Sequence, residues 1–309
     1  MFVAAVLVAL ALAPGKSDAQ ACCSPTDPAI WGSEGRGESW VLGAEFKFRE
    51  AVASFDADGR RWHLGDSQVR DWALTLAGGF RFGSRAWQLY ASVPFLVQRR
   101  SFGTLSAPTH FGFGDSQLMI RWTPLEDPMN GWEDPTPFLD LFASAQIPTG
   151  RAPEEARSVT GADVTGDGTW HLRLGLQATK FIDHGRHAPS MELVVGHSMA
   201  RQPLADGPTI AQGLEFALRA GWLYALTPRW SLTTSVDLQW RRRATDDGRK
   251  VARSESRRTL FGLEARRVII PFAWEASASL TSDAWWSGAT TNLAFAGPSA
   301  SLGIRRFHP

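Results

Sequence analysis

The sequence has no long apolar run beyond its N-terminal segment. No stretch after residue 21 approaches the roughly 20 consecutive apolar residues of a membrane-spanning helix. It also has no Gly-rich phosphate-binding loop between a strand and a helix. Any membrane crossing by this chain must therefore be made by strands.

Cysteine and tyrosine are scarce. The only cysteines, Cys22 and Cys23, are adjacent, so the sequence contains no internal disulfide framework. A lipid anchor on Cys22 and an intermolecular disulfide are alternatives to a plain flexible terminus. The net charge of +1 argues against nucleic acid as a partner. The sequence has 14 Trp and 18 Phe but only 2 Tyr. A membrane interface accommodates such large rings.

The N-terminal residues are typical of a secretory signal peptide. Phe2 to Ala13 is apolar but too short to span a membrane, and small residues with acceptable cleavage sites follow it. We expect residues 1–21 to be a signal peptide, residues 22–38 a flexible mature N-terminus, and residues 39–309 a single folded domain of an exported protein.

Apolar and polar residues alternate along most of the remaining chain. In the stretch that follows Gly168, Leu172 and Leu174 belong to one face while His171 and Arg173 belong to the other. A period of two predicts strands with one dry and one wet face. The predicted strands cover residues 40–49, 71–82, 87–97, 117–122, 139–147, 170–179, 191–195, 214–224, 230–241, 261–266, 272–281 and, least regularly, 291–307.

The links between these strands are alternately short and long. Short links are predicted near residues 83–85, 182–189, 227–229 and 267–271, and long polar links near 51–67, 99–113, 149–168, 199–213 and 242–257. The exception is 124–137, a long link where a short one is due. Strands that run up and down produce this pattern, with periplasmic turns at one end and extracellular loops at the other.

A soluble β-sandwich would alternate in the same way, but its strands average about 5–6 residues. The apolar faces here persist for about 9–12 residues, the length with which a tilted strand crosses a bilayer. Trp and Phe also fall at strand ends, where interfacial girdles lie. We therefore predict an all-β fold, a transmembrane up-and-down antiparallel β-barrel of about 12 strands in the bacterial outer membrane.

Three motifs carry a family resemblance. Gly112-Phe113-Gly114-Asp115 precedes one strand, Ile147-Pro148-Thr149-Gly150 ends the next, and Gly166-Asp167-Gly168-Thr169-Trp170 opens the third. This order resembles the outer-membrane barrel family named for the meta-pathway of phenol degradation, over about residues 112–180. The resemblance implies an outer-membrane barrel that passes small, often apolar or aromatic, compounds. It brings no catalytic or binding residues.

Few patterns indicate chemistry. His197 and Ser198 are adjacent, but neighbours on a strand point to opposite faces and cannot form a nucleophile–base pair. His184 and His187 share a polar turn, where solvation is favoured over metal binding. Asp167 lies in a long loop without EF-hand spacing, so a turn-forming role is favoured over calcium. We expect no catalytic residue, no metal and no cofactor.

The polar faces of the strands are predicted to line the lumen. The lumen-lining residues by parity are Glu45, Lys47, Arg49, Asp71, Arg121, Asp140, His171, Arg173, Glu192, Glu215, Arg219, Asp237, Arg241, Glu264, Arg266 and Glu275. Acids and bases nearly balance, whereas a strongly ion-selective pore has one dominant sign. Because confined charges are costly unless they are paired, we expect mutual pairing. In particular, we expect Arg173 to bridge Asp140 and Glu192. Such pairs could plug the lumen or line a narrow path.

These observations predict a non-enzymatic outer-membrane channel or transporter for small molecules. The expected partners are outer-membrane lipid and lipopolysaccharide, a small-molecule solute and the barrel assembly machinery. The basic groups at residues 241–243 and 257–258 suit lipopolysaccharide phosphates or solvent better than nucleic acid. A non-transporting structural or adhesive barrel is the alternative, and an outer-membrane lipid hydrolase is a more distant one.

Overall fold

The computed structural model describes residues 39–308, except 84–85, 104, 107–108, 129–130, 132, 203–208, 272, 287–288 and 294. The predicted signal peptide and the N-terminal segment with Cys22 and Cys23 lie outside this range. Within it, helix is limited to a single 3-10 turn, Pro153–Glu155. No helix in this part of the chain is long and apolar enough to cross a membrane.

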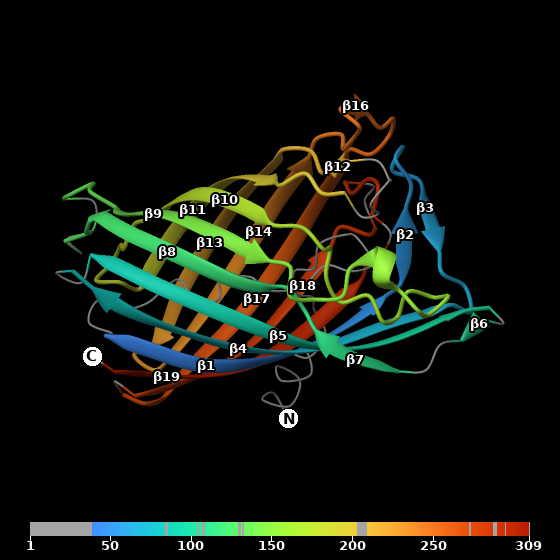
Figure 1. Cartoon of the computed structure of the whole chain (residues 1–309). Helices are drawn as coiled ribbons and strands as arrows, with labels where there is room; N and C mark the ends of the chain where they lie inside the picture. The colour runs from blue at the N-terminus through green and yellow to red at the C-terminus, as the bar shows by residue number, and fades with distance from the viewer. Residues whose placement is uncertain are drawn as a thin grey trace, which may run out of the picture.

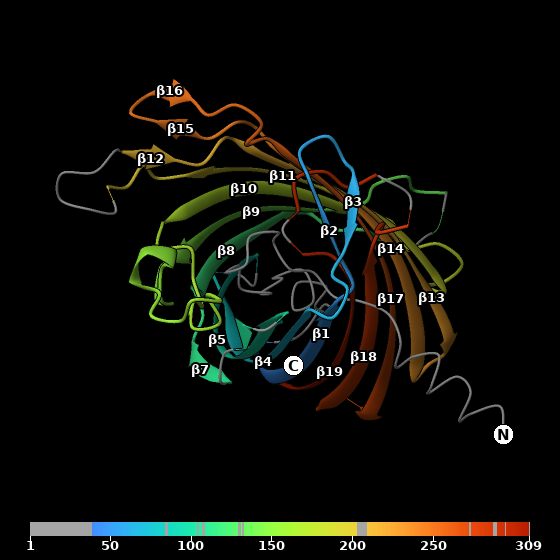
Figure 2. The ribbon, with the colours of Figure 1, turned by 90° about the vertical axis from the view of Figure 1, so that its right-hand side faces the viewer.

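Twelve long antiparallel strands of the described chain form a closed barrel (Figures 1 and 2). They are β1 (Trp40–Ala51), β4 (Gln68–Phe82), β5 (Trp87–Phe102), β8 (Ser116–Leu125), β9 (Phe138–Ile147), β10 (His171–Thr179), β11 (His187–Ser198), β13 (Glu215–Thr227), β14 (Trp230–Arg241), β17 (Ser256–Ile270), β18 (Trp274–Asp283) and β19 (Pro298–His308). Each strand pairs with its neighbours in this order, and β1 pairs with β19 from Trp40–His308 to Arg49–Ser299, which closes the ring. The predicted up-and-down barrel is confirmed.

Several strand boundaries differ from the prediction. β17 covers Ser256–Ile270 rather than residues 261–266, and β5 continues to Phe102 rather than ending near residue 97. β11 begins at His187 rather than near residue 191, because Asp183 and His184 adopt positive φ angles of 50° and 54° and turn the chain tightly. β19 begins at Pro298 rather than near residue 291. The residues before it fold against the mouth of the barrel, where Leu293 and Ala296 are buried in a loop cluster.

Short strands lie at one end of the barrel, which we call the loop end. The opposite end, which has the short links, is called the turn end. The short strands are β2 (Ala53–Phe55), β3 (Arg61–His63), β6 (Leu105–Ser106), β7 (His110–Phe113), β12 (Ile210–Ala211), β15 (Thr245–Asp246) and β16 (Arg249–Lys250). In Figure 1 they gather at the same end as the 3-10 turn. The β2–β3 hairpin packs through Ala53 and Phe55 on Leu293 and Ala296, so it covers part of the loop end.

The outer surface of the barrel is apolar. Leu42, Phe46, Leu174, Leu193 and Leu302 are between 47% and 68% exposed. Exposing such side chains to water is unfavourable, whereas lipid accepts them. This belt lies on the face that the period-two pattern assigns to lipid.

Aromatic rings flank the belt at both ends. At the turn end, Trp87 stacks on Trp122 with ring centroids 5.6 Å apart. At the loop end, Trp170 and Trp240 are 42% and 39% exposed. Rings with an apolar body and a polar edge are favoured at the two boundaries of a bilayer.

Leu174→Arg should destabilise the barrel by about 2–4 kcal/mol, because it places a charge on the lipid face near the bilayer midplane. Gln177→Arg is the control, since Gln177 lies between Asp140 and Glu192 on the opposite face of the same strand. Urea unfolding followed by heat-modifiable gel mobility measures both. Equal destabilisation of the two variants would contradict the assignment of faces.

Candidate functional site

The predicted lumen-lining side chains all lie on the buried face of the barrel wall. All sixteen are buried or half-buried, whereas the residues between them on the same strands include the exposed belt. In a closed barrel the face that is shielded from solvent and lipid is the inner one. His171 is the most enclosed of them, at 1% exposure.

Most charged side chains of this face are paired across adjacent strands. Arg49 lies opposite Asp71 in the β1–β4 register and binds it at 2.7 Å. Arg219 lies opposite Asp237 and binds it at 2.9 Å. Opposite residues of antiparallel strands have Cβ atoms only about 4.5–5.5 Å apart, so register alone brings these charges together.

Other pairs depend on longer reach. Arg121 is 3.6 Å from Asp140, which lies diagonally from it on β9. Glu264 and Arg266 are next-but-one neighbours on β17 and form two hydrogen bonds of 2.8 and 3.0 Å. Glu275 and Arg305, by contrast, are direct register partners on β18 and β19 and bind at 3.0 Å. Arg305 was not predicted, because the irregular pattern of the last strand gave no parity.

Glu215 is the centre of the largest ionic group. Its carboxylate lies 2.7 Å from Arg241, 3.4 Å from Arg173 and 3.5 Å from His171 Nδ1. The other ring nitrogen of His171 contacts Asp167. One acid on β13 therefore binds cations from two other strands, β10 and β14.

The prediction that Arg173 bridges Asp140 and Glu192 was wrong. Arg173 lies opposite Ser144 and Gly196, whereas the two acids flank Gln177, four residues further along β10. Neighbouring strands were identified correctly, but register along them was not.

Gly196 lets Arg173 reach a strand that is not its neighbour. Glu215 is on β13, and β11 lies between it and β10. A Cβ atom at Gly196 would lie 2.9 Å from Arg173 Cγ and 3.3 Å from Glu215 Oε2. The absence of a side chain there leaves room for the guanidinium to pass over β11.

The three motifs of the family resemblance meet at one buried carboxylate, Asp115. Its two oxygens accept hydrogen bonds at 3.0 Å from Gly150 N, Asp167 N and Gln146 Nε2. Asp115 is fully buried. We call Asp115, Gln146, Gly150, Gly166 and Asp167 the rim junction; it ties the loop over residues 148–170 to the loop end of β8 and β9.

Backbone packing explains the glycines of these motifs. A Cβ at Gly150 would lie 2.7 Å from Gly166 N, and one at Gly166 would collide with Asp115. Only glycine permits backbones to approach this closely. The sequence signal at the rim junction is therefore structural.

The two rim carboxylates differ in their electrostatics. Burial raises the pKa of Asp115 to about 6, and the charge of Asp167 acts in the same direction against the N–H donors. Burial also acts to raise the pKa of Asp167, but the hydrogen bond and charge of His171 outweigh it and hold the pKa below its usual value. His171 therefore stabilises the charged form of Asp167.

Two further buried ion pairs lie at the ends of the barrel. The period-two pattern did not predict them, because their members lie in links or at strand ends. Lys180 binds Asp127 at 2.7 Å within the turn end. Arg258 binds Asp283 at 2.5 Å at the loop end. Asp127 also accepts the backbone N–H of Phe181 at 2.6 Å, which ties the long 126–137 link to its neighbouring turn.

The residues considered for metal binding have other surroundings. The His184 side chain is 99% exposed beside Asp183. Asp163 accepts hydrogen bonds from Arg157 N, Ser158 N and Arg151, so it organises its own loop. Within the described residues no group of three or more His, Cys, Asp or Glu side chains could hold a metal ion.

The basic groups beside the 242–255 loop divide between the two faces. Arg241 and Arg258 are in the buried ion pairs above. Arg243 binds Glu255, Arg242 lies 5.6 Å over the Phe216 ring, and Arg257 is exposed.

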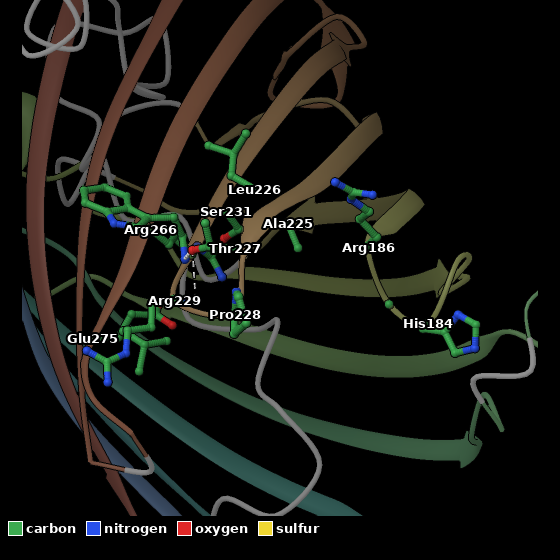
Figure 3. Close-up of a pocket in the computed structure, with 13 residues that line it drawn as sticks. His184, Arg186, Ala225, Leu226, Thr227, Pro228, Arg229, Ser231, Arg266 and Glu275 are labelled. Atoms are coloured by element: carbon green, nitrogen blue, oxygen red, sulfur yellow. Dashed lines mark hydrogen bonds between the residues drawn. The ribbon is translucent and has the colours of Figure 1, made fainter. Parts of the chain in front are cut away.

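A cavity of about 570 Å³ opens at the turn end (Figure 3). It is lined by the turns around Arg186 and Arg229 and by Arg266 and Glu275 from the buried face of β17 and β18. The cavity therefore connects the outside of the turn end with the ion-paired wall.

Comparison with known proteins supports the architecture. The chain is similar to the crystal structure of an outer-membrane channel from Pseudomonas putida F1, with a TM-score of 0.71 and 13% identity, covering 91% of this chain and 99% of that one. It is also similar to the translocator domain of the autotransporter NalP from Neisseria meningitidis, with a TM-score of 0.50, 11% identity, and coverage of 90% and 91%. No protein-family model and no curated sequence matches the chain.

At these identities the likeness establishes the fold. A closed antiparallel barrel with an apolar outer belt is the form in which strands cross the bacterial outer membrane. The chain is an outer-membrane β-barrel.

Asp115→Asn should loosen the rim junction by about 1–3 kcal/mol, because the amide leaves at least one buried N–H donor without its acceptor. We expect faster trypsin cleavage after Arg151 and Arg157, with the heat-modifiable mobility of the barrel retained. Asp66→Asn, an exposed acid of another loop, is the control. Unchanged cleavage in Asp115→Asn would show that the loop is held by other contacts.

Proposed function

We propose that the protein is a passive channel for small molecules in the outer membrane. The observation that carries the proposal is the combination of a closed barrel and a polar, ion-paired inner face that meets an open cavity at the turn end. A barrel that served only as a membrane anchor would have no need for many charges inside it, because buried charges are costly even when paired.

The structural neighbour from Pseudomonas putida F1 is described as an outer-membrane channel, which supports the same role here. The resemblance to the meta-pathway barrel family adds small apolar or aromatic compounds as the solute class. Likeness to an autotransporter translocator domain supports the barrel form, and nothing in the inner face favours transport of a polypeptide.

The ionic composition supports weak ion selectivity. With Arg305 added, the predicted set has eight acidic side chains and eight Arg or Lys side chains, with His171 in addition. A passage lined by balanced pairs has no ring of one sign to select cations or anions.

We do not propose an enzyme. His197 is exposed and Ser198 is buried, so they point to opposite faces. His171 lies opposite Ser198, but both of its ring nitrogens face carboxylates, and Ser198 Oγ bonds Gln212. A general base needs an accessible nitrogen at its nucleophile.

Contact with lipopolysaccharide follows from the outer face of the loop end. Arg257 lies opposite the exposed Trp240 in the β14–β17 register, and Arg242 lies over the Phe216 ring, at the loop end of the apolar belt. Phosphate groups of the outer leaflet are the matching anions. Insertion by the barrel assembly machinery is the expected route for such a fold.

Two substitutions that remove charges of opposite sign from the ionic group around Glu215 test the proposed passage. Arg173→Ala removes one positive charge from the group around Glu215 and should shift the reversal potential in a salt gradient toward cations. Glu215→Gln leaves Arg173, Arg241 and His171 without their shared acid and should shift it toward anions. Both variants and the parent would be reconstituted in planar bilayers.

Heat-modifiable mobility of each variant controls for assembly. Shifts of opposite sign would support a solute path along this wall. Identical reversal potentials in parent and both variants, with measurable conductance, would mean that the path lies elsewhere. A parent that passes neither ions nor neutral solutes would overturn the channel.

A further inference from the structure

An apolar stripe runs around part of the inner wall. Reading the register sideways from β19 to β8 gives a row of directly opposed residues: Phe307, Val41, Gly79, Tyr90 and Met119. These positions share the parity of the lumen-facing charges. The row lacks charge although its neighbours above and below are polar.

The stripe continues beyond β8 with a small offset. Phe142 on β9 lies opposite Gly175 on β10, and Gly175 lies opposite Val194 on β11. Val41, Tyr90, Met119 and Phe142 form one buried cluster, with exposures between 1% and 8%, and Val194 and Phe307 pack against it. From Phe307 on β19 to Val194 on β11 the stripe touches eight of the twelve long strands, about two thirds of the circumference.

Two glycines hold the aromatic rings flat against the wall. A Cβ at Gly79 would lie 2.5 Å from Tyr90 Cδ1, and a Cβ at Gly175 would collide with the Phe142 ring. The rings therefore occupy the space that side chains at these positions would need. Any side chain there must push the ring toward the barrel axis.

Arg121 lies beside the two aromatic rings of the stripe. Its guanidinium carbon is 6.0 Å from the Tyr90 ring and 5.9 Å from the Phe142 ring, and the residue is 3% exposed. The Tyr90 hydroxyl is hydrogen-bonded to the Gln88 side chain at 2.6 Å. The apolar layer, the cation at its edge and the Gln88 side chain thus form one packed unit of the inner wall.

The rest of the wall is polar. β13, β14, β17 and β18 contribute the Arg219–Asp237 and Arg266–Glu264 pairs and Glu275, whose partner Arg305 is on β19. Between them lie small hydroxyl side chains such as Ser279, which bonds Ser301 of β19 at 2.8 Å. The inner wall therefore has apolar side chains along the stripe and polar side chains on the remaining strands.

We propose that this apolar stripe is the constriction of the channel and that it slows hydrated ions more than uncharged solutes. The inference rests on the proposed channel function. A hydrated ion cannot exchange its water for ligands on an apolar surface, and hydrophobic constrictions obstruct ions by dewetting. Phe142 and Tyr90 set the width, and Gly175 and Gly79 hold them open against the wall.

Two substitutions should change conductance in opposite directions. Phe142→Ala removes a ring and should raise single-channel conductance several-fold in planar bilayers. Gly175→Ala displaces that ring toward the axis and should lower both conductance and the swelling rate of liposomes in an uncharged sugar.

Each variant has a matched control. Phe46→Ala removes a ring of the same size from the outer face of β1, where Phe46 is 47% exposed. Gly221→Ala adds a Cβ on the inner face of β13, where its nearest neighbour is the Ser190 hydroxyl at 2.8 Å rather than an aromatic ring. Neither control should change conductance. Heat-modifiable mobility verifies assembly, and Phe142→Ala decides the test if Gly175→Ala does not assemble.

The outcomes separate this inference from the function on which it rests. A rise in Phe142→Ala that is absent in Phe46→Ala supports the constriction. If the parent passes the sugar and Phe142→Ala conducts ions like Phe46→Ala, the constriction is overturned and the channel stands. If neither parent nor variants pass ions or sugar, both are overturned.

Discussion

The structure depends on one constraint: every backbone N–H and C=O that enters a membrane must be paired within the protein. Strands satisfy it only when their sheet closes, and here the closing seam is the register between β1 and β19. Closure divides each strand into an outward and an inward set of side chains. The outward set must be apolar, so the polar residues of a chain with 20% charged residues are concentrated inside and in the loops.

Charges inside a narrow barrel are tolerated because the sheet itself brings opposite signs together. Arg49 faces Asp71 and Arg219 faces Asp237 as direct register partners. Removing one member of such a pair leaves the other as a buried charge without an opposite charge beside it, which is costly. The charges of the inner face therefore occur as pairs. The same wall also has the apolar stripe, whose two glycines give the rings of Tyr90 and Phe142 their place. The inner face is thus occupied in part by ion pairs and in part by the packed side chains of the apolar stripe.

The sequence predicts which residues face inward far better than it predicts which of them meet. Parity is a local property, so the twelve-strand barrel and the burial of residues such as Glu45 and Asp237 follow from a period of two. Register depends on the length of each link and on the stagger of the closed sheet, which no single strand encodes. Arg173 illustrates the difference. Its strand and face were predicted, but its acid is Glu215, two strands away, and the route to it exists only because Gly196 has no side chain.

The motifs that resemble a known barrel family belong to the rim and not to the lumen. Asp115, Gly150 and Gly166 come from three separate segments, and their spacing in the chain gives no sign that they converge on one carboxylate. Their glycines are required by close backbone approach and their acid by three N–H donors, so these residues specify how a long loop is fastened to the barrel. The proposed lining of the passage consists of other residues, such as Tyr90 and Phe142, which lie outside the motifs. A resemblance carried by the rim therefore reports architecture, whereas the selection of a solute would depend on the inner wall, where the proposed constriction lies.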